Sequence, residues 1–557
     1  MTASTNGAAP WNTGIGGFAA AVRGEPGWIF GAISLVAVAF FFVGLSSDGF
    51  WADELFTVFV VDHHGGLPEV LARALTDTQP PGYYVVLHGW ARVFGRSEAA
   101  LRALSAVLCL AALAIFGLGT SRAFSPRARL FTIAAAATSP FLFVESQEAR
   151  NYALCLLLSA LLLDLAMRAR AAALKNDVIS PFVIAGLCIV GAMGAAVHFY
   201  EFLTVGLVYL FLIVTIPRLT LRLVLVGAGV VILAAQLAYI RTLLESTQQN
   251  LHAMWFRSDS VFFLTELLGV FKGLCGPGTL VALLAISAHM ARAGPSTLRS
   301  EAHSSSDTAW TRGLSATVML GIIGGGIFVS LAFTPSFSAR NVLVASPFVW
   351  PVMAGYFDAA QRRADRPWAI AATVIPVAAL VGQLGFQAER WLPRSEAWRE
   401  SARFVLATPG CGGQIIPVVL PARFAPATPF FRTLFERHFY GYYFTDPSRR
   451  LQAFRAEELT DKTLNPSLRH RLGSAVGGAT CPVLAWAVHD IEEPAARRLA
   501  DHLAAAAGVA PTRVNVIPFE SYRQVWGYVL PSRFAFVWVR QTPTARFSGA
   551  KPLNRQR

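Results

Sequence analysis

Residues 28–45 read WIFGAISLVAVAFFFVGL, an uncharged apolar stretch that is long enough to cross a bilayer as a helix. Over the 557 residues, 54% are apolar and only 14% are charged, which excludes an ordinary soluble domain, a coiled coil and a disordered chain. The sequence therefore predicts an α-helical polytopic membrane protein with about eleven transmembrane helices, the first of which stays in place as a signal anchor. The ten other expected spans are 100–119, 129–144, 151–168, 179–197, 200–216, 222–240, 276–291, 313–333, 341–357 and 367–386.

Lys and Arg in the short loops predict the orientation. The loops after every second span hold fourteen of these residues, whereas the alternate short connections hold only Arg150 and Arg340. Because basic loops stay in the cytoplasm, we expect residues 1–27 to be a cytoplasmic tail and residues 388–557 to lie outside. Residues 28–387 then form the transmembrane domain, with 46–99 as its first outer loop.

One apolar segment of that outer loop, residues 83–94, is only about twelve residues long and is too short for a span. Counting it as a span would place every Arg-rich loop outside the cell. We therefore expect juxtamembrane helices in the first outer loop, with this segment lying on the outer membrane surface.

The chain changes character from Ala388 onwards, where short apolar segments alternate with amphipathic ones. We predict strands at 414–420, 482–488, 513–519 and 534–541 and helices at 395–407 and 493–507, which together make a small extracytoplasmic α/β domain. Lys and Arg exceed Asp and Glu by 10 in this region, out of a net charge of +14 for the chain. That excess favours membrane lipids or an anionic glycan as partners over nucleic acid.

Two of the six cysteines, Cys411 and Cys481, fall in the predicted outer domain, each beside a predicted strand. Because that side of the membrane is oxidising, we predict a disulfide between them. The other four lie in or at spans, where small apolar packing explains them. The sequence has no CxxC motif and no His-rich metal spacing.

Ionisable residues at the outer ends of spans need an explanation, because charged groups are costly near lipid. Each has a simple structural reading: a helix cap, a local ion pair, or a side chain that reaches the lipid headgroups. Their concentration on four separate outer loops instead favours one shared cleft. These residues are Asp53 and Glu54 after the first span, Glu148 and Arg150 after the third, His198 and Glu201 between the fifth and sixth, and Arg340 before the tenth.

Such a cleft suits the transfer of a group from a phosphate-bearing lipid to an acceptor hydroxyl. A carboxylate can accept the hydroxyl proton, while Arg and His neutralise the charge that grows on the departing phosphate. Both effects are stronger in partly dehydrated surroundings.

Four blocks of this sequence, in this order, resemble the GT-C membrane glycosyltransferases of the protein O-mannosyltransferase and aminoarabinose-transferase type. The likeness is best over residues 50–200 and extends loosely to about residue 360 through Arg340 and the prolines Pro347 and Pro351. The blocks are WADE at 51–54, TQPPGYY at 78–84, SEAALR at 97–102 and SQEARNY at 146–152.

The resemblance implies an inverting transfer of a sugar from a polyprenyl-phosphate-linked donor to an acceptor on a glycan, lipid or protein, at the outer face of the bacterial inner membrane. It implies that Asp53 activates the acceptor, that Glu54 orients it or binds sugar, and that Glu148 is the second-loop acid. Arg150, His198 and Arg340 would contact the lipid phosphate. Candidate substrate contacts are Gln79, Tyr83, Tyr84, Tyr152 and Glu201. The sequence departs from the family pattern at Gln79, where His is common, and at Asn341, where Tyr is common.

Two other classes of function remain open from the sequence. A transporter or flippase for lipid-linked sugars fits eleven spans, but it should show polar groups near the membrane midplane and paired repeats, and neither is evident. A membrane scaffold for cell-envelope glycan assembly would act through its outer domain. A divalent cation is also conceivable, because Asp53, Glu54 and Glu148 offer the oxygen ligands that such ions prefer, although no spacing demands one.

Overall fold

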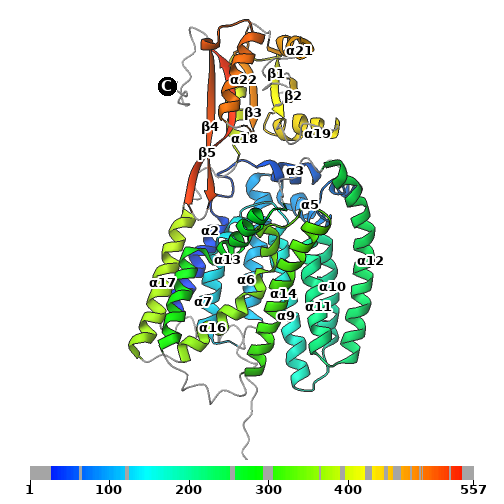
Figure 1. The fold of residues 1–557 in the computed structure, drawn as a ribbon, viewed down its shortest axis with the longest axis vertical. Coiled ribbons are helices and arrows are strands. Elements are labelled where there is room, and N and C mark those ends of the chain that lie inside the picture. Colours follow the sequence, from blue (N-terminus) through cyan, green and yellow to red (C-terminus); the bar gives the residue numbers. More distant parts are fainter. Residues whose placement is uncertain are drawn as a thin grey trace, which may run out of the picture.

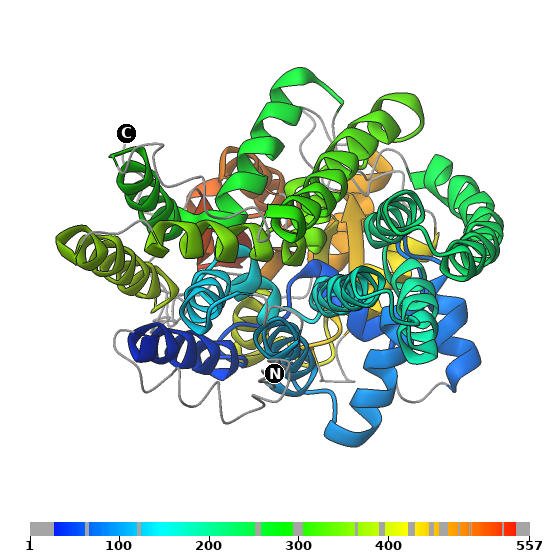
Figure 2. The ribbon, with the colours of Figure 1, turned by 90° about the horizontal axis from the view of Figure 1, so that it is seen from below.

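A computed structural model describes residues 27–61, 66–119, 124–250, 258–292, 305–362, 366–388, 396–420, 429–444, 450–455, 466–476, 480–488, 491, 493–525 and 528–541. It consists of a helical bundle with a small α/β domain at one end, separated by a layer of short helices (Figure 1). Figure 2 looks along the bundle from the end that is remote from the α/β domain. The bundle helices lie next to one another, and the α/β domain is behind them. Nearly all of the predicted tail 1–27 lies outside the described residues.

The bundle helices coincide with the eleven apolar segments. Within the described ranges, five helices are long and apolar enough to cross a membrane, or up to seven if each of two bent pairs counts as one span, and four shorter apolar helices match the remaining segments. The chain is thus a multi-pass membrane protein. The bundle helices are α2 (Gly27–Phe42), α6 (Glu98–Leu118), α7 (Pro126–Ala137), α8 (Pro140–Ser146), α9 (Tyr152–Leu174), α10 (Pro181–Val197), α11 (Phe199–Thr215), α12 (Leu219–Asn250), α13 (Ser260–Arg292), α14 (Ser305–Ala332), α15 (Ala339–Val342), the 3₁₀ helix η5 (Leu343–Phe348), α16 (Trp350–Arg362) and α17 (Arg366–Ala388).

Three of the predicted spans differ from simple straight helices. Segment 129–144 is bent by 64° between α7 and α8, and segment 341–357 is bent by 53° before α16. The first bend follows from local chemistry, because the Ser139 hydroxyl accepts from Leu142 N–H and Pro140 occupies the first turn of α8. The predicted span 276–291 is only the second half of α13, which begins at Ser260 and is interrupted at Gly276, where φ is 53°.

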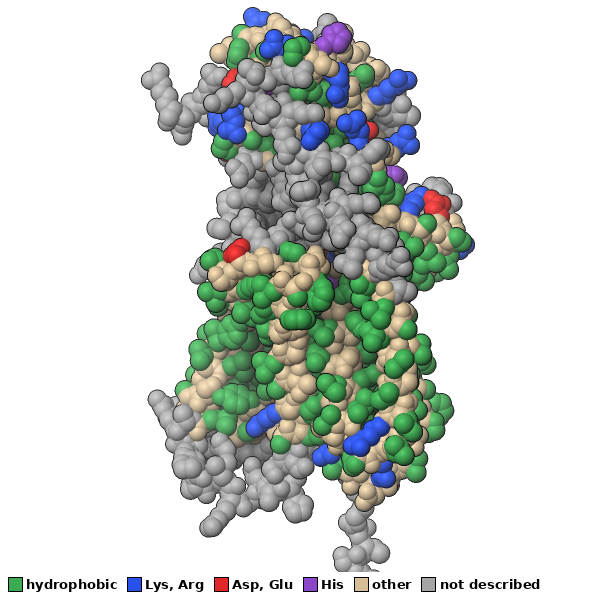
Figure 3. Space-filling view, turned by 45° about the vertical axis from the view of Figure 1, so that its right-hand side comes forward, with side chains coloured by type: hydrophobic (Ala, Val, Ile, Leu, Met, Phe, Trp, Pro, Cys, Tyr) green, Lys and Arg blue, Asp and Glu red, His purple; other side chains and the backbone are tan. Residues whose placement is uncertain are grey.

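The surface of the bundle is apolar over most of its height. On the face drawn in Figure 3, hydrophobic side chains cover the bundle, whereas Lys and Arg gather at its end remote from the α/β domain and on that domain. Exposed Leu and Val side chains recur along α12, among them Leu223, Val230 and Leu237. This distribution matches a lipid-facing surface between two polar ends.

Residues 46–99 hold three short helices: α3 (Ala52–Val60), α4 (Leu67–Ala74) and α5 (Gly82–Phe94). Helices α3 and α5 lie between the bundle and the α/β domain, and α4 packs against both of them (Figure 1). The segment 83–94 that was predicted to lie on the membrane surface is a helix, α5. It packs tightly against the end of α10, because a Cβ at Gly82 would lie 2.5 Å from the carbonyl oxygen of Ala196.

The α/β domain is built on a five-stranded sheet of order β2-β1-β3-β5-β4. The pairs β1–β2 and β1–β3 are parallel, whereas β3–β5 and β4–β5 are antiparallel. The four predicted strands and both predicted helices are present, whereas β2 and α21 were not predicted. The elements are α18 (Trp398–Ala407), β1 (Ile415–Leu420), α19 (Pro429–Thr433), the π-helical turn η8 (Leu434–Tyr440), β2 (Arg450–Arg455), α21 (Pro466–Val476), β3 (Val483–Val488), α22 (Glu493–Ala506), η9 (Pro511–Arg513), β4 (Val514–Val525) and β5 (Tyr528–Arg540).

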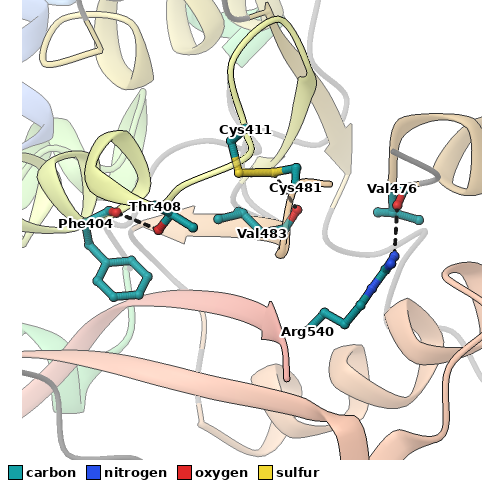
Figure 4. The surroundings of a disulfide bond; sticks show 7 residues. All are labelled: Phe404, Thr408, Cys411, Val476, Cys481, Val483 and Arg540. Carbon is teal, nitrogen blue, oxygen red and sulfur yellow. Dashed lines mark hydrogen bonds between the residues drawn. A yellow bond between two sulfur atoms is a disulfide. The ribbon is translucent and has the colours of Figure 1, made fainter. Parts of the chain in front are cut away.

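The predicted disulfide between Cys411 and Cys481 is confirmed. It joins the turn after α18 to the residues just before β3, and both cysteines are buried (Figure 4). The four remaining cysteines, Cys109, Cys155, Cys188 and Cys275, are free thiols in the bundle.

Candidate functional site

Asp53 lies in the first turn of α3, where the chain enters the layer between the bundle and the α/β domain. Its side chain is 47% exposed, and Oδ2 lies 3.7 Å from Nη2 of the nearly buried Arg150. Arg150 also donates through Nη1 to the Asp53 carbonyl oxygen and to Thr57 Oγ1, both at 3.3 Å. Asp53 is thus an accessible carboxylate with a buried cation behind it.

Glu54, the next residue, is fully buried and points the other way. Its Oε1 accepts from Arg102 Nε and from the Ala149 backbone N–H, both at 2.8 Å. Its Oε2 accepts from Arg102 Nη2 at 2.5 Å and from the Trp51 N–H at 3.3 Å. Four donors occupy the four acceptor sites of a carboxylate, so Glu54 has none left for substrate. The expectation that Glu54 orients the acceptor or binds sugar is therefore replaced by a structural role, and Arg102 is its unpredicted partner.

Arg340 is held by two carboxylates and two aromatic rings. It pairs with Glu145 at 2.7 Å and 3.1 Å through Nε and Nη2, and it also contacts Glu148. Its guanidinium carbon lies 4.4 Å from the ring centre of Tyr152 and 5.5 Å from that of Trp51. Cation–π contacts and a bidentate ion pair fix the plane of the guanidinium, which stays 26% exposed.

Glu148 is the less enclosed of the two carboxylates, with 22% of its side chain exposed against 2% for Glu145. Burial raises the pKa of Glu148 above its ordinary value, although Arg340 opposes this shift. Since two acids share one guanidinium, the cluster of Glu145, Glu148 and Arg340 carries a net negative charge when both acids are ionised. The sequence pattern did not single out Glu145.

His198 lies between α10 and α11 and is fully buried. Its Nδ1 accepts from the Tyr200 N–H at 3.0 Å, which places the proton of a neutral ring on Nε2. Burial, with the nearby charge of Arg150, lowers the pKa of His198 to about 3. The ring is therefore neutral at pH 7 and can donate a hydrogen bond, but it does not supply the positive charge that we expected from it.

The candidate substrate contacts fall into two groups. Tyr83, Tyr84 and Tyr152 are buried, and Tyr84 donates its hydroxyl hydrogen to Asp77, whose pKa burial raises. Asp77 is an unpredicted member of the site, since Arg150 acts on it electrostatically. Glu201, in contrast, is fully buried in α11 and accepts from Ser159 of α9 at 3.0 Å through both oxygens, so it points into the bundle.

Buried polar atoms without a protein hydrogen-bond partner recur on the described parts of these loops; among them are Trp51 Nε1, Gln79 Oε1, Tyr83 Oη, Arg150 Nε, Asn151 Oδ1 and His198 Nε2. More than nine in ten buried polar groups in proteins are paired, so such groups need a reason. Donors and acceptors on loops that surround an accessible carboxylate are what a hydroxyl-rich or phosphate-bearing ligand requires.

The arrangement does not suit a divalent cation. Among the described residues, no group of three His, Cys, Asp or Glu side chains is placed to hold a metal ion. Glu54 has no free acceptor site, and Glu148 is taken up by Arg340. The carboxylates Asp53, Glu54 and Glu148 therefore do not form the oxygen-ligand set that we considered from the sequence.

The contacts bring together Asp53, Glu54, Glu148, Arg150, Tyr152 and Arg340 from three loops at the end of the bundle that faces the α/β domain, and His198 lies against Tyr152, with ring centres 5.5 Å apart. Tyr84 and Asp77 bond to each other, and the charge of Arg150 acts on both, while Gln79 lies just ahead of α5. Glu201 is the one candidate residue whose side chain points away from this group and into the bundle.

The fold has solved relatives. The structure is similar to ArnT from Cupriavidus metallidurans in the apo state, with a TM-score of 0.51, 14% identity and coverage of 92% of this chain and 98% of that chain. It is also similar to the same protein bound to undecaprenyl phosphate, with a TM-score of 0.50, 13% identity and the same coverage of 92% and 98%. The oligosaccharyltransferase from Archaeoglobus fulgidus is more distant, with a TM-score of 0.42, 12% identity and coverage of 90% and 73%. No family model and no curated protein matches the sequence. The chain has the GT-C fold.

Proposed function

We propose that this protein is an inverting glycosyltransferase that moves a sugar from a polyprenyl-phosphate-linked donor to an acceptor hydroxyl at the outer face of the bacterial inner membrane. One observation carries the proposal: outer loops distant in the sequence converge on the half-exposed Asp53, with Arg150 directly behind it and Arg340 on the neighbouring loop. The acceptor is a glycolipid, a polysaccharide or a protein.

The residues divide the chemistry between them. Asp53 accepts the proton of the acceptor hydroxyl as its oxygen attacks the anomeric carbon of the sugar from the side opposite the phosphate. The bond between that carbon and the phosphate oxygen breaks, and the lipid phosphate leaves with the electron pair. Arg150 and Arg340 stabilise the negative charge on the leaving phosphate, and the neutral His198 donates a hydrogen bond.

The solved relative supports the choice of donor. ArnT, whose fold this chain shares, has been crystallised with undecaprenyl phosphate. A polyprenyl phosphate presents its headgroup at the membrane surface while its tail stays in lipid, which fits a polar site between an apolar bundle and an outer domain.

The test is a transfer assay with the full chain in proteoliposomes. Radiolabelled polyprenyl-phosphate sugars are supplied with cell-envelope glycolipid, polysaccharide or protein acceptors, and the label on the acceptor and its anomeric configuration are measured. We expect transfer from at least one donor with inversion. Translocation of the donor across the vesicle membrane without transfer would contradict the proposal and identify a flippase instead.

The pairing of Glu148 with Arg340 predicts a pH dependence of donor use. Protonation of Glu148 removes one of the two carboxylates that compete with the donor phosphate for Arg340, which stays paired with Glu145, and burial raises the pKa at which this occurs. The donor is a phosphodiester that stays ionised, so its apparent affinity should rise as the pH falls towards that pKa. Replacing Glu148 by Gln should flatten the profile and keep the affinity high. A profile for Glu148→Gln that follows the wild type would contradict the competition.

A further inference from the structure

The α/β domain contacts the loop that carries Asp53 through an apolar interface. The Phe50 and Tyr442 rings meet edge to face with centres 5.7 Å apart, and Phe59 of α3 packs on His438 of η8 at 4.6 Å. The buried residues of this interface belong to the same hydrophobic cluster as the core of the bundle. The α/β domain and the first outer loop therefore form one packed unit.

Hydrogen bonds from this domain then hold the backbone just before Asp53. Arg399 donates to the carbonyl oxygens of Ser46 at 3.1 Å and Ser47 at 2.6 Å. The Tyr443 hydroxyl accepts from the Phe50 N–H at 2.6 Å and donates to Glu98 at 2.5 Å. Arg399 also pairs with Glu98, so both side chains of the domain are anchored on the start of α6.

Arg102 of α6 holds the same segment from the bundle side. It donates at 2.9 Å to each of the carbonyl oxygens of Leu45, Asp48 and Gly49, while it binds Glu54. Arg102 and Arg399 thus share the five consecutive carbonyls of residues 45–49. A segment whose carbonyls are all fixed by guanidinium groups from two parts of the protein has little freedom to shift.

Glu396 completes this arrangement at the helix that carries Asp53. Its Oε2 accepts from the Ala52 backbone N–H at 3.0 Å, and the carboxylate is itself held by Trp398 Nε1 at 2.6 Å. Ala52 is the first residue of α3, whose initial N–H groups lack partners within the helix. A carboxylate at that end satisfies one of them and is favoured by the helix dipole. Asp53 is the next residue.

We infer that the α/β domain contributes to the transfer site through Glu396. This side chain is a positioning residue that fixes the start of α3 and thereby the direction of the Asp53 carboxylate. The inference rests on the proposed function and assigns a role to the domain. It predicts that Glu396 influences the rate of transfer and leaves donor binding alone, since Arg340 and Arg150 do not contact this domain in the described hydrogen bonds.

The test compares two substitutions of Glu396 in the full-length protein, with rates normalised to folded protein that elutes as a single peak in detergent. Glu396→Leu removes the acceptor and should lower kcat about 10- to 100-fold, because misplacement of a reacting group by about 1 Å can have such an effect. The apparent KM for a polyprenyl-phosphate sugar should stay within about twofold. Glu396→Gln keeps an acceptor oxygen and should retain most of the activity. Arg497→Ala, on the exposed surface of α22, is the control and should behave as wild type.

A second pair of variants shows whether Glu396 acts through Asp53. In an Asp53→Asn background, Glu396→Leu should lower the residual single-turnover rate by less than twofold, because the group that it positions is already lost. Gly49→Ala should reproduce the kcat defect although it deletes no hydrogen-bonding group, since its Cβ would lie 2.9 Å from Arg399 Cβ and push the loop away from the domain.

The outcomes separate the two proposals. Wild-type kcat in Glu396→Leu, or equal losses in the wild-type and Asp53→Asn backgrounds, would overturn the positioning role while Asp53→Asn still lowers the rate of transfer strongly. Wild-type transfer by Asp53→Asn would instead remove the proposed mechanism, and the inference would fall with it.

Discussion

Asp53→Asn is expected to lower the rate of sugar transfer by about 10²- to 10⁴-fold, which is the usual contribution of a positioned general base. Asn has nearly the same shape but cannot accept the proton. Because the Asp53 side chain is half exposed and its contact with Arg150 is 3.7 Å long, the loss of this ion pair should change stability little. The measurement is kcat and the apparent donor KM in proteoliposomes.

The matched control is Asp501→Asn, which changes an exposed aspartate on α22 of the α/β domain. It should leave both kinetic constants unchanged. If Asp53→Asn keeps wild-type turnover at a normal amount of folded protein, another group activates the acceptor. A rise in donor KM with unchanged kcat would place Asp53 in donor binding and would also contradict its role as the base.

The membrane helices could be predicted because a long apolar run needs no distant partner to become a helix in lipid. The breaks within these helices were harder to predict. The sequence did contain a signal for one of them, because Ser139 followed by Pro140 is a helix-start pattern inside the segment 129–144. The first half of α13 was missed because Glu266 and Lys272 lower its apolar character. Glu266 finds its partner in the Ala339 N–H, 73 residues away, which no local pattern reveals.

The gathering of these loops could be expected from the predicted topology, since loops on one side of a membrane share one surface. The division of labour within that surface could not be predicted, and Asp53 and Glu54 illustrate why. Adjacent residues on a helix point about 100° apart. One carboxylate therefore faces the accessible side of α3 and the other faces Arg102, and the sequence pattern does not say which.

The α/β domain was recognised by its alternating strands, but β2 and α21 were missed. In β2 the sequence RLQAFR carries three polar residues of six, as suits a strand at the edge of the sheet. The bonds from Arg399 and Glu396 to the first outer loop join residues more than 340 positions apart. Contacts of this kind depend on the folded domain, so the sequence alone left the role of the domain undefined.

Arg102→Ala is expected to destabilise the protein strongly. Arg102 is 4% exposed and Glu54 is fully buried, so the substitution leaves an ionised carboxylate without its cation and three carbonyls without donors. Removing one partner of a buried ion pair typically costs about 3–5 kcal/mol, which is a large part of the free energy of unfolding of most proteins. The measurement is the half-life of the folded protein in detergent at a fixed raised temperature, because membrane proteins rarely unfold reversibly.

The buried charge itself can be separated from the lost packing with a second substitution. Glu54→Gln in the Arg102→Ala background removes the uncompensated charge while it keeps the side-chain shape, so the double variant should be more stable than Arg102→Ala alone. Arg73→Ala is the control, because its pair with Glu69 is a partly exposed contact within α4 and should be worth at most about 1 kcal/mol. A half-life of Arg102→Ala equal to that of Arg73→Ala would contradict the structural role of this pair.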